Sequence, residues 1–124
     1  MIVGIGTDIA SIPRIEAAWK RTGDRFARRI LTDAEYAVFE QRSFSPAYLA
    51  TRFAAKEAAS KAFGTGIGKV SFQEMEITNL ESGAPVMTFS GAAEVLQMEK
   101  GIQHIHISLS DEKEFAQAFV IFES

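Results

Sequence analysis

The chain has 124 residues and a net charge of −3, with 47% hydrophobic residues and no cysteine. This length fits a single domain, and the lack of cysteine excludes disulfides and thiolate metal sites. No apolar run approaches the roughly 20 residues of a membrane helix, and the opening MIVGIGTD has no basic signal region. A cytoplasmic protein is therefore expected, and so much apolar material in a short chain favours an oligomer.

Basic residues are concentrated in one segment. Residues 14–29 contain six basic and two acidic side chains, a net charge of +4. Since the whole chain has a net charge of −3, the remaining residues together carry −7. A local basic surface on an acidic protein suggests an acidic partner. A solvated helix face explains the same charges equally well.

The first third of the chain predicts a strand followed by three helices. Residues 2–9 predict a buried strand with one face of Val3, Ile5 and Ile9 and another of Gly4, Gly6 and Asp8. A helix is predicted from Ser11-Ile12-Pro13 to Gly23, and Asp24 is expected to cap a short second helix. Thr32 followed by Glu35 is the capping box of a third helix.

The remaining chain predicts the longest helix and then mostly strands. That helix runs from Pro46 to Phe63 and ends at Gly64. Beyond it we expect strands at 70–78 and 86–90 around a hairpin connection at 81–85, a helix at 91–100, and strands at 103–110 and 115–123. Apolar residues change face within 70–78, which indicates a bulge. The last strand is apolar on both faces, so it should be central or packed against another subunit.

Together these elements predict one α+β domain over residues 1–124. Its helices should lie on one side of a mostly antiparallel sheet, because the helices come first and most strands come last.

Two acidic residues and a lysine are the candidates for chemistry. Glu57 and Lys61 share one face of the long helix, whose many alanines permit a close neighbour that could bring Asp8 near Glu57. A divalent cation would relieve the repulsion between two carboxylates, and hard oxygen ligands favour magnesium. Such a pair with a lysine suits cleavage of a pyrophosphate. Taken singly, the same residues fit a solvated helix pair and a helix cap.

Two further patterns are ambiguous from their residues alone. The glycine-rich segment 64–68 follows a helix C-terminus, where the dipole is negative, so by itself it is a helix stop and a turn. His104, His106, Ser108 and Ser110 share one strand face, which is either solvated or places His106 in a site as a hydrogen-bond donor or proton carrier. A zinc site there lacks a third ligand.

Three segments resemble one known family. The opening GIGTDI with Arg14-Ile15, the helix segment RFAAKEAASKAFGTG from Arg52 to Gly66, and His106 with Ser108 are similar to motifs of the holo-acyl-carrier-protein synthases. These enzymes are the short group of the phosphopantetheinyl transferases. The resemblance spans essentially the whole chain.

The resemblance implies a fold, a metal, substrates and an assembly. The expected fold is that of the 4′-phosphopantetheinyl transferases, with Mg²⁺ held by Asp8 and Glu57, and with a homotrimer whose active sites lie at subunit interfaces. Glu57 and Lys61 would be catalytic, Lys61 beside the pyrophosphate. The residues implied near coenzyme A are Arg52, Lys61, Gly64, Gly83, Pro85 and His106.

The implied reaction transfers 4′-phosphopantetheine from coenzyme A to a serine of an apo-acyl carrier protein, in support of fatty acid biosynthesis. Adenosine 3′,5′-bisphosphate leaves, and Glu57 or a water on the metal takes the serine proton. An acidic carrier protein would be steered by the basic helices, chiefly by Arg14, Arg21, Arg25 and Arg28.

Two other functions compete with this one. A nucleic-acid-binding module could use the basic helices, but the chain is acidic overall and its strands lack an aromatic stacking platform. A coenzyme A sensor would bind the same ligand without transfer. The joint presence of Asp8, Glu57 and Lys61 argues against a catalytically dead copy. Because the chain is acidic overall and has no long apolar run, we expect neither nucleic acid nor a membrane as a partner.

Overall fold

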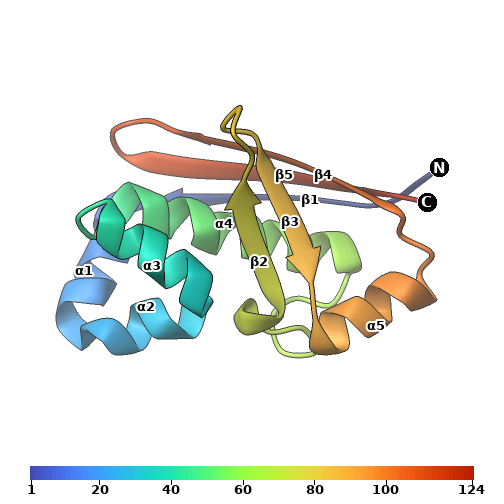
Figure 1. Ribbon diagram of the computed structural model, residues 1–124, viewed down its shortest axis with the longest axis horizontal. Coiled ribbons are helices and arrows are strands. Elements are labelled where there is room, and N and C mark those ends of the chain that lie inside the picture. The colour runs from blue at the N-terminus through green and yellow to red at the C-terminus, as the bar shows by residue number, and fades with distance from the viewer.

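A computed structural model describes all of residues 1–124. The long helix α4 (Pro46–Phe63) lies at the centre of the molecule. The elements in chain order are β1 (Ile2–Ser11), α1 (Ile12–Thr22), α2 (Asp24–Ile30), α3 (Asp33–Gln41), α4 (Pro46–Phe63), the 3₁₀ helix η1 (Phe72–Glu74), β2 (Met75–Asn79), β3 (Pro85–Phe89), α5 (Gly91–Glu99), β4 (His104–Asp111) and β5 (Phe115–Glu123). Figure 1 shows the three-stranded sheet along one side of α4, with the β2–β3 hairpin and the short helices on the other.

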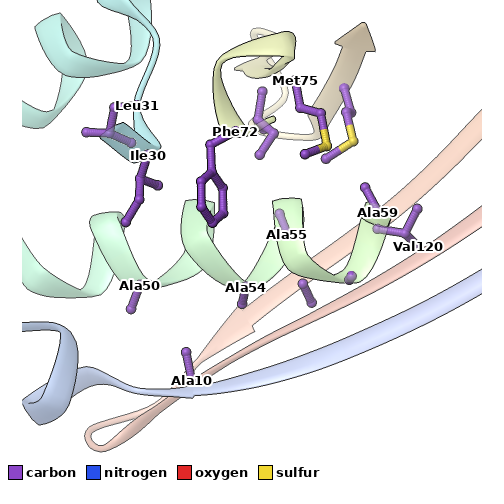
Figure 2. Packing of buried hydrophobic residues seen from close by; sticks show 14 of the residues in the cluster. Ala10, Ile30, Leu31, Ala50, Ala54, Ala55, Ala59, Phe72, Met75 and Val120 are labelled. Carbon is purple, nitrogen blue, oxygen red and sulfur yellow. The ribbon is translucent and has the colours of Figure 1, made fainter. Parts of the chain in front are cut away.

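Alanine makes this central position possible. Four alanines on successive turns of α4, at 54, 55, 58 and 59, are completely buried. In Figure 2, Ala10 of β1 and Val120 of β5 approach the helix from one side, while Phe72 and Met75 approach it from the other. Small side chains let both layers come close to the helix backbone, so α4 is a rigid support for any side chain it carries.

The helix boundaries follow the predicted capping signals. Ser11 and Ser45 accept hydrogen bonds from backbone N–H groups in the first turns of α1 and α4, and Thr32 with Glu35 forms the predicted capping box of α3. Gly64 ends α4 in the left-handed conformation. No helix is long and apolar enough to cross a membrane.

The three-stranded sheet is antiparallel in the order β1-β5-β4, so β5 is the central strand, as predicted. Its inward residues Ala118, Val120 and Phe122 are fully buried, whereas Phe119 on the outward face is 40% exposed. On β1 the glycine face packs against α4, and the apolar face looks outward, with Ile5 58% exposed. The prediction correctly divided the residues of β1 between two faces, but its apolar face is not the buried one within this chain.

Three predicted details are wrong. The apolar residues of 70–78 change face because residues 72–74 form the 3₁₀ helix η1, so the strand covers only Met75–Asn79 and contains no bulge. The hairpin β2–β3 forms a sheet of its own rather than extending a single sheet. Asp24 is the first residue of α2 rather than its cap, and its carboxylate accepts a hydrogen bond from the hydroxyl of Tyr36.

Candidate active site

Asp8 and Lys61 meet where β1 crosses α4. The Lys61 Nζ atom donates to the Asp8 Oδ1 atom at 3.0 Å and to the Thr7 carbonyl oxygen, also at 3.0 Å. Asp8 comes from the inward face of β1, and its side chain is only 16% exposed. The structure thus brings together a strand residue and a helix residue that are 53 positions apart.

Glu57 belongs to the same group. It lies one turn before Lys61 on α4, and its carboxylate is close enough to Asp8 for the two to repel each other. Burial raises the pKa of Glu57 above its ordinary value, the charge of Asp8 raises this pKa further, and Lys61 opposes the shift. Asp8 and Lys61 are thus in contact, and Glu57 is near enough to both for their charges to change its pKa.

The chemistry of this group suits a divalent ion with few protein ligands. No cluster of three or more histidine, aspartate or glutamate side chains able to hold a metal occurs in the chain. An ion at Asp8 and Glu57 would therefore have two carboxylate ligands and would complete its shell with water or phosphate oxygens. This is the usual mode of magnesium binding. The raised pKa of Glu57 also fits such an ion, because bound positive charge would relieve the repulsion that causes part of the shift.

Glu57 also lines a small apolar cavity of about 270 Å³ between α2, α4 and η1. Five of its seven lining residues are hydrophobic, among them Phe26, Phe53 and Phe72, and Arg29 also lines it. An apolar surface thus adjoins the carboxylate and contributes to the burial that raises its pKa.

A second cavity, of about 310 Å³, contains three of the residues implied to contact coenzyme A. Arg52 of α4 lines it with Gly83 and Pro85 of the β2–β3 hairpin. The same cavity is lined by residues that the sequence analysis did not name, chiefly Arg42, Tyr48, Thr51, Asn79 and Asp111.

Arg52 is held firmly in this cavity. It is 5% exposed, its guanidinium carbon lies 4.2 Å from the centre of the Tyr48 ring, and one terminal nitrogen donates to the Asn79 Oδ1 atom at 2.8 Å. Its Nε–H is buried without any hydrogen-bond partner. The cavity therefore contains a buried cation, which could pair with an anionic ligand.

The other three residues implied to contact coenzyme A lie outside this cavity, and Lys61 among them lies at the contact with Asp8. His106 is on the outward face of the three-stranded sheet, where its Nε2 atom is 3.0 Å from the Glu123 Oε1 atom. Gly64 is exposed at the end of α4 and lines neither cavity. Within one chain, neither residue joins Arg52 in its cavity.

The basic residues predicted to meet a partner are solvent-exposed on α1 and α2. They are Arg14, Arg21, Arg25 and Arg28. Arg28 is partly engaged within the chain, because its guanidinium lies 3.6 Å from the centre of the Tyr36 ring and 3.7 Å from Asp33. The other three make no ion pair and are available to an external anion.

Comparison with known proteins identifies the family of this chain. A model of the 4′-phosphopantetheinyl transferase superfamily matches residues 4–120. The chain belongs to this superfamily. It is 52% identical to a holo-[acyl-carrier-protein] synthase of Vibrio campbellii over 99% of this chain and 98% of that one.

Solved structures of relatives extend the similarity to the fold. The holo-[acyl-carrier-protein] synthase of Neisseria meningitidis superposes with a TM-score of 0.94 at 46% identity, covering 100% of both chains. A Bacillus anthracis relative in complex with CoA (3′,5′-ADP) superposes at 0.84 with 44% identity, covering 100% of this chain and 98% of that one. The predicted fold class, the family resemblance and the assignment as an enzyme of the holo-[acyl-carrier-protein] synthase type are therefore confirmed.

The second cavity, called the Arg52 cavity below, also contains residues that sequence reasoning missed. Arg42 and Tyr48 flank the start of α4, and Asn79 closes β2, so only the folded chain brings them together. The single local signal was Arg42, a cation just before the N-terminus of the long helix.

Proposed function

We propose that this phosphopantetheinyl transferase uses Mg²⁺ to transfer 4′-phosphopantetheine from coenzyme A to a serine of an apo-acyl carrier protein, with release of adenosine 3′,5′-bisphosphate. The observation that carries the proposal is the convergence of Asp8, Glu57 and Lys61 at the crossing of β1 and α4. Fatty acid biosynthesis is the expected use of the product, and the cytoplasm is the expected location.

Asp8 and Glu57 would hold the ion, which when bound neutralises charge on the pyrophosphate. Lys61, already within hydrogen-bond distance of Asp8, would place its ammonium group on a pyrophosphate oxygen and stabilise the leaving bisphosphate. Its anchor on the Thr7 carbonyl fixes its direction without using up all three of its N–H donors.

In the proposed step, a new bond forms between the serine oxygen and the phosphorus that carries pantetheine. The bond between that phosphorus and the bridging pyrophosphate oxygen breaks, and the electron pair stays on the bisphosphate. The serine proton moves to the Glu57 carboxylate or to a water molecule.

The Arg52 cavity is the proposed site of the nucleotide part of coenzyme A. The guanidinium groups of Arg52 and the neighbouring Arg42 supply donors for a phosphate group, and the Gly83–Pro85 turn, which lacks large side chains, leaves room for an adenosine. The complex of the Bacillus anthracis relative with CoA (3′,5′-ADP) is consistent with such a ligand.

A homotrimer with shared active sites is the proposed assembly. Arg52 and Glu57 lie five positions apart on α4, about 140° around the helix, so one chain presents the nucleotide cavity and the acids on different sides. The strands that border these two sites, β4 and β1, are opposite edges of the sheet. The outward apolar residues of that sheet, Ile5, Ile9, Phe115 and Phe119, offer the surface on which a second copy would bring the two half-sites together.

The deciding experiment is transfer of radiolabelled phosphopantetheine to a purified apo-acyl carrier protein. Transfer with Mg²⁺, its loss on strict chelation, and stoichiometric release of adenosine 3′,5′-bisphosphate are expected. Undiminished turnover under chelation would reject the metal, and binding of coenzyme A without transfer would reject the enzyme activity in favour of a sensor.

A further inference from the structure

The closest approach between β1 and α4 occurs at two glycines. A Cβ atom added at Gly6 would lie far inside 3.0 Å of the Ala58 carbonyl oxygen, and one at Gly4 would lie equally close to the Ala62 carbonyl oxygen. These oxygens belong to the helix backbone, which cannot rotate aside as a side chain can. The strand backbone therefore rests directly on the helix backbone at both positions.

The two contacts are aligned with the acidic group. Ala58 directly follows Glu57 and Ala62 directly follows Lys61, so each glycine contacts the carbonyl group of the residue after a member of the candidate site. Gly6 precedes Asp8 by two residues and points to the same face of β1. The distance between Asp8 and Glu57 is thus set across the Gly6 contact.

We propose that Gly6 is a positioning residue for the metal site, because its missing side chain fixes the separation of the Asp8 and Glu57 carboxylates. This inference rests on the proposed function, since it concerns the ion that those two carboxylates would share. Gly4 makes the same kind of contact one pleat further from Asp8, and it serves mainly to pack the strand.

The expected displacement can be estimated. An alanine at residue 6 would push β1 away from the Ala58 carbonyl by about 1.5 Å before an ordinary contact is restored. Metal–ligand distances in proteins vary by only about 0.2 Å, so Asp8 could no longer share an ion with Glu57. A glutamate at residue 8 would add one carbon–carbon bond of about 1.5 Å and recover that reach.

The test measures binding of Mn²⁺, as a spectroscopic substitute for Mg²⁺, in the presence of saturating coenzyme A and without carrier protein. Binding is followed by electron paramagnetic resonance of the free ion, so no turnover is needed. Gly6→Ala should weaken Mn²⁺ binding tenfold or more, whereas the matched control Gly4→Ala should weaken it less than threefold. Equal losses in the two variants would reduce Gly6 to an ordinary packing residue.

The second part of the test is rescue. Asp8→Glu should weaken Mn²⁺ binding in the wild-type background and strengthen it in the Gly6→Ala background. An effect of the same sign in both backgrounds would overturn the inference. Circular dichroism and thermal midpoints report whether each variant folds. If Gly6→Ala does not fold, Mn²⁺ binding is compared between the wild type and Asp8→Glu only. Equal binding by these two proteins would show that the spacing of the carboxylates is not fixed, and would overturn the inference.

The two levels of the proposal fail differently. A wild-type protein that binds no Mn²⁺ with coenzyme A would reject the metal site itself, and with it the proposed function. A wild-type protein that binds the ion, together with a Gly6→Ala variant of unchanged affinity, would reject only the role of Gly6.

Discussion

The Nζ atom of Lys56 lies 2.6 Å from the Oε1 atom of Glu35, and the two side chains are enclosed at 0% and 1% exposure. Lys56 also donates to the carbonyl oxygens of Ile30 and Phe72, so all three of its N–H donors are used. Glu35 in turn accepts from the backbone N–H groups of Thr32 and Ile77. One ion pair therefore joins α2, α3, η1 and β2 to the helix that carries Glu57.

The first prediction concerns the stability of this pair. Lys56→Met should lower the free energy of unfolding by about 3–5 kcal/mol, because it leaves a buried carboxylate without its counter-charge. Chemical denaturation at fixed protein concentration measures the effect. The matched control is Lys20→Met, which removes an exposed helix pair with Glu16 at 3.7 Å and should cost about 0.5 kcal/mol or less. A similar loss in both variants would contradict the buried role.

The second prediction concerns the pKa of Glu57, which is raised by burial and by the charge of Asp8. Asp8→Asn removes that charge while keeping the shape, so the pKa of Glu57 should fall toward its ordinary value without reaching it, since burial remains. Carbon-detected NMR titration of the glutamate carboxyl groups measures the shift. Glu16→Gln, on the exposed face of α1, should leave the pKa of Glu57 unchanged.

The same shift has a consequence for stability. A carboxyl group with a raised pKa binds its proton more tightly in the folded state, so its contribution to stability is present at low pH and is lost as the pH rises through the folded-state pKa. Without metal, the stability of the wild type relative to Glu57→Gln should therefore fall from pH 4 to pH 7. Added Mg²⁺ should reverse this trend, and a flat difference in both conditions would contradict it.

Local signals predicted the helices well, and they failed where contacts between distant segments decide the outcome. Ser45 and Gly64 mark both ends of α4 in the sequence, and the structure agrees with them. The strand β1 was expected to be buried, but only its glycine face is covered within one chain, because the backbone at Gly4 and Gly6 packs against α4. Nothing near Lys56 indicates that this lysine is buried, since its partners come from α2, α3 and η1.

The candidate site shows the same difference between local sequence signals and contacts of distant segments. Asp8, Glu57 and Lys61 could be named from the sequence because the motif around α4 is long and specific. Their actual contact depends on the crossing of β1 over α4. The Arg52 cavity draws on helix, hairpin and strand residues far apart in the chain, so only its Arg52, Gly83 and Pro85 were foreseen.

The third prediction concerns the nucleotide cavity. Arg52→Lys keeps the positive charge but loses the planar guanidinium group. That group donates a hydrogen bond to Asn79 and lies over the Tyr48 ring. Binding of coenzyme A should weaken about 10–100-fold, as expected for a lost charged hydrogen bond. Adenosine 3′,5′-bisphosphate should lose the same factor in calorimetry, because the cavity is proposed to hold that half of the ligand. Lys113→Ala, in the exposed β4–β5 turn, is the control and should change neither affinity.

The fourth prediction concerns the basic helices. Charge reversal by Arg14→Glu and Arg25→Glu should raise the KM for an acidic acyl carrier protein tenfold or more at low salt and leave the KM for coenzyme A unchanged. The difference should shrink as salt increases, because exposed charges are screened beyond a Debye length of about 8 Å at physiological ionic strength. Lys113→Glu, which lies outside the segment, serves as the control. An unchanged KM for the carrier protein at low salt would make the basic patch incidental.

The fifth prediction tests whether two copies build one active site. Asp8→Asn disables the acidic half-site and Arg52→Ala disables the nucleotide half-site, so each variant alone should be inactive. If the halves of one site come from different subunits, an equal mixture that exchanges subunits should recover about a quarter of wild-type activity, because one interface in four pairs two intact halves. Ile9→Lys, on the outward apolar face, should lower the fraction of trimer measured by analytical ultracentrifugation and should abolish this recovery of activity. If both halves came from the same chain, mixing would restore nothing, since every site would contain one disabled half.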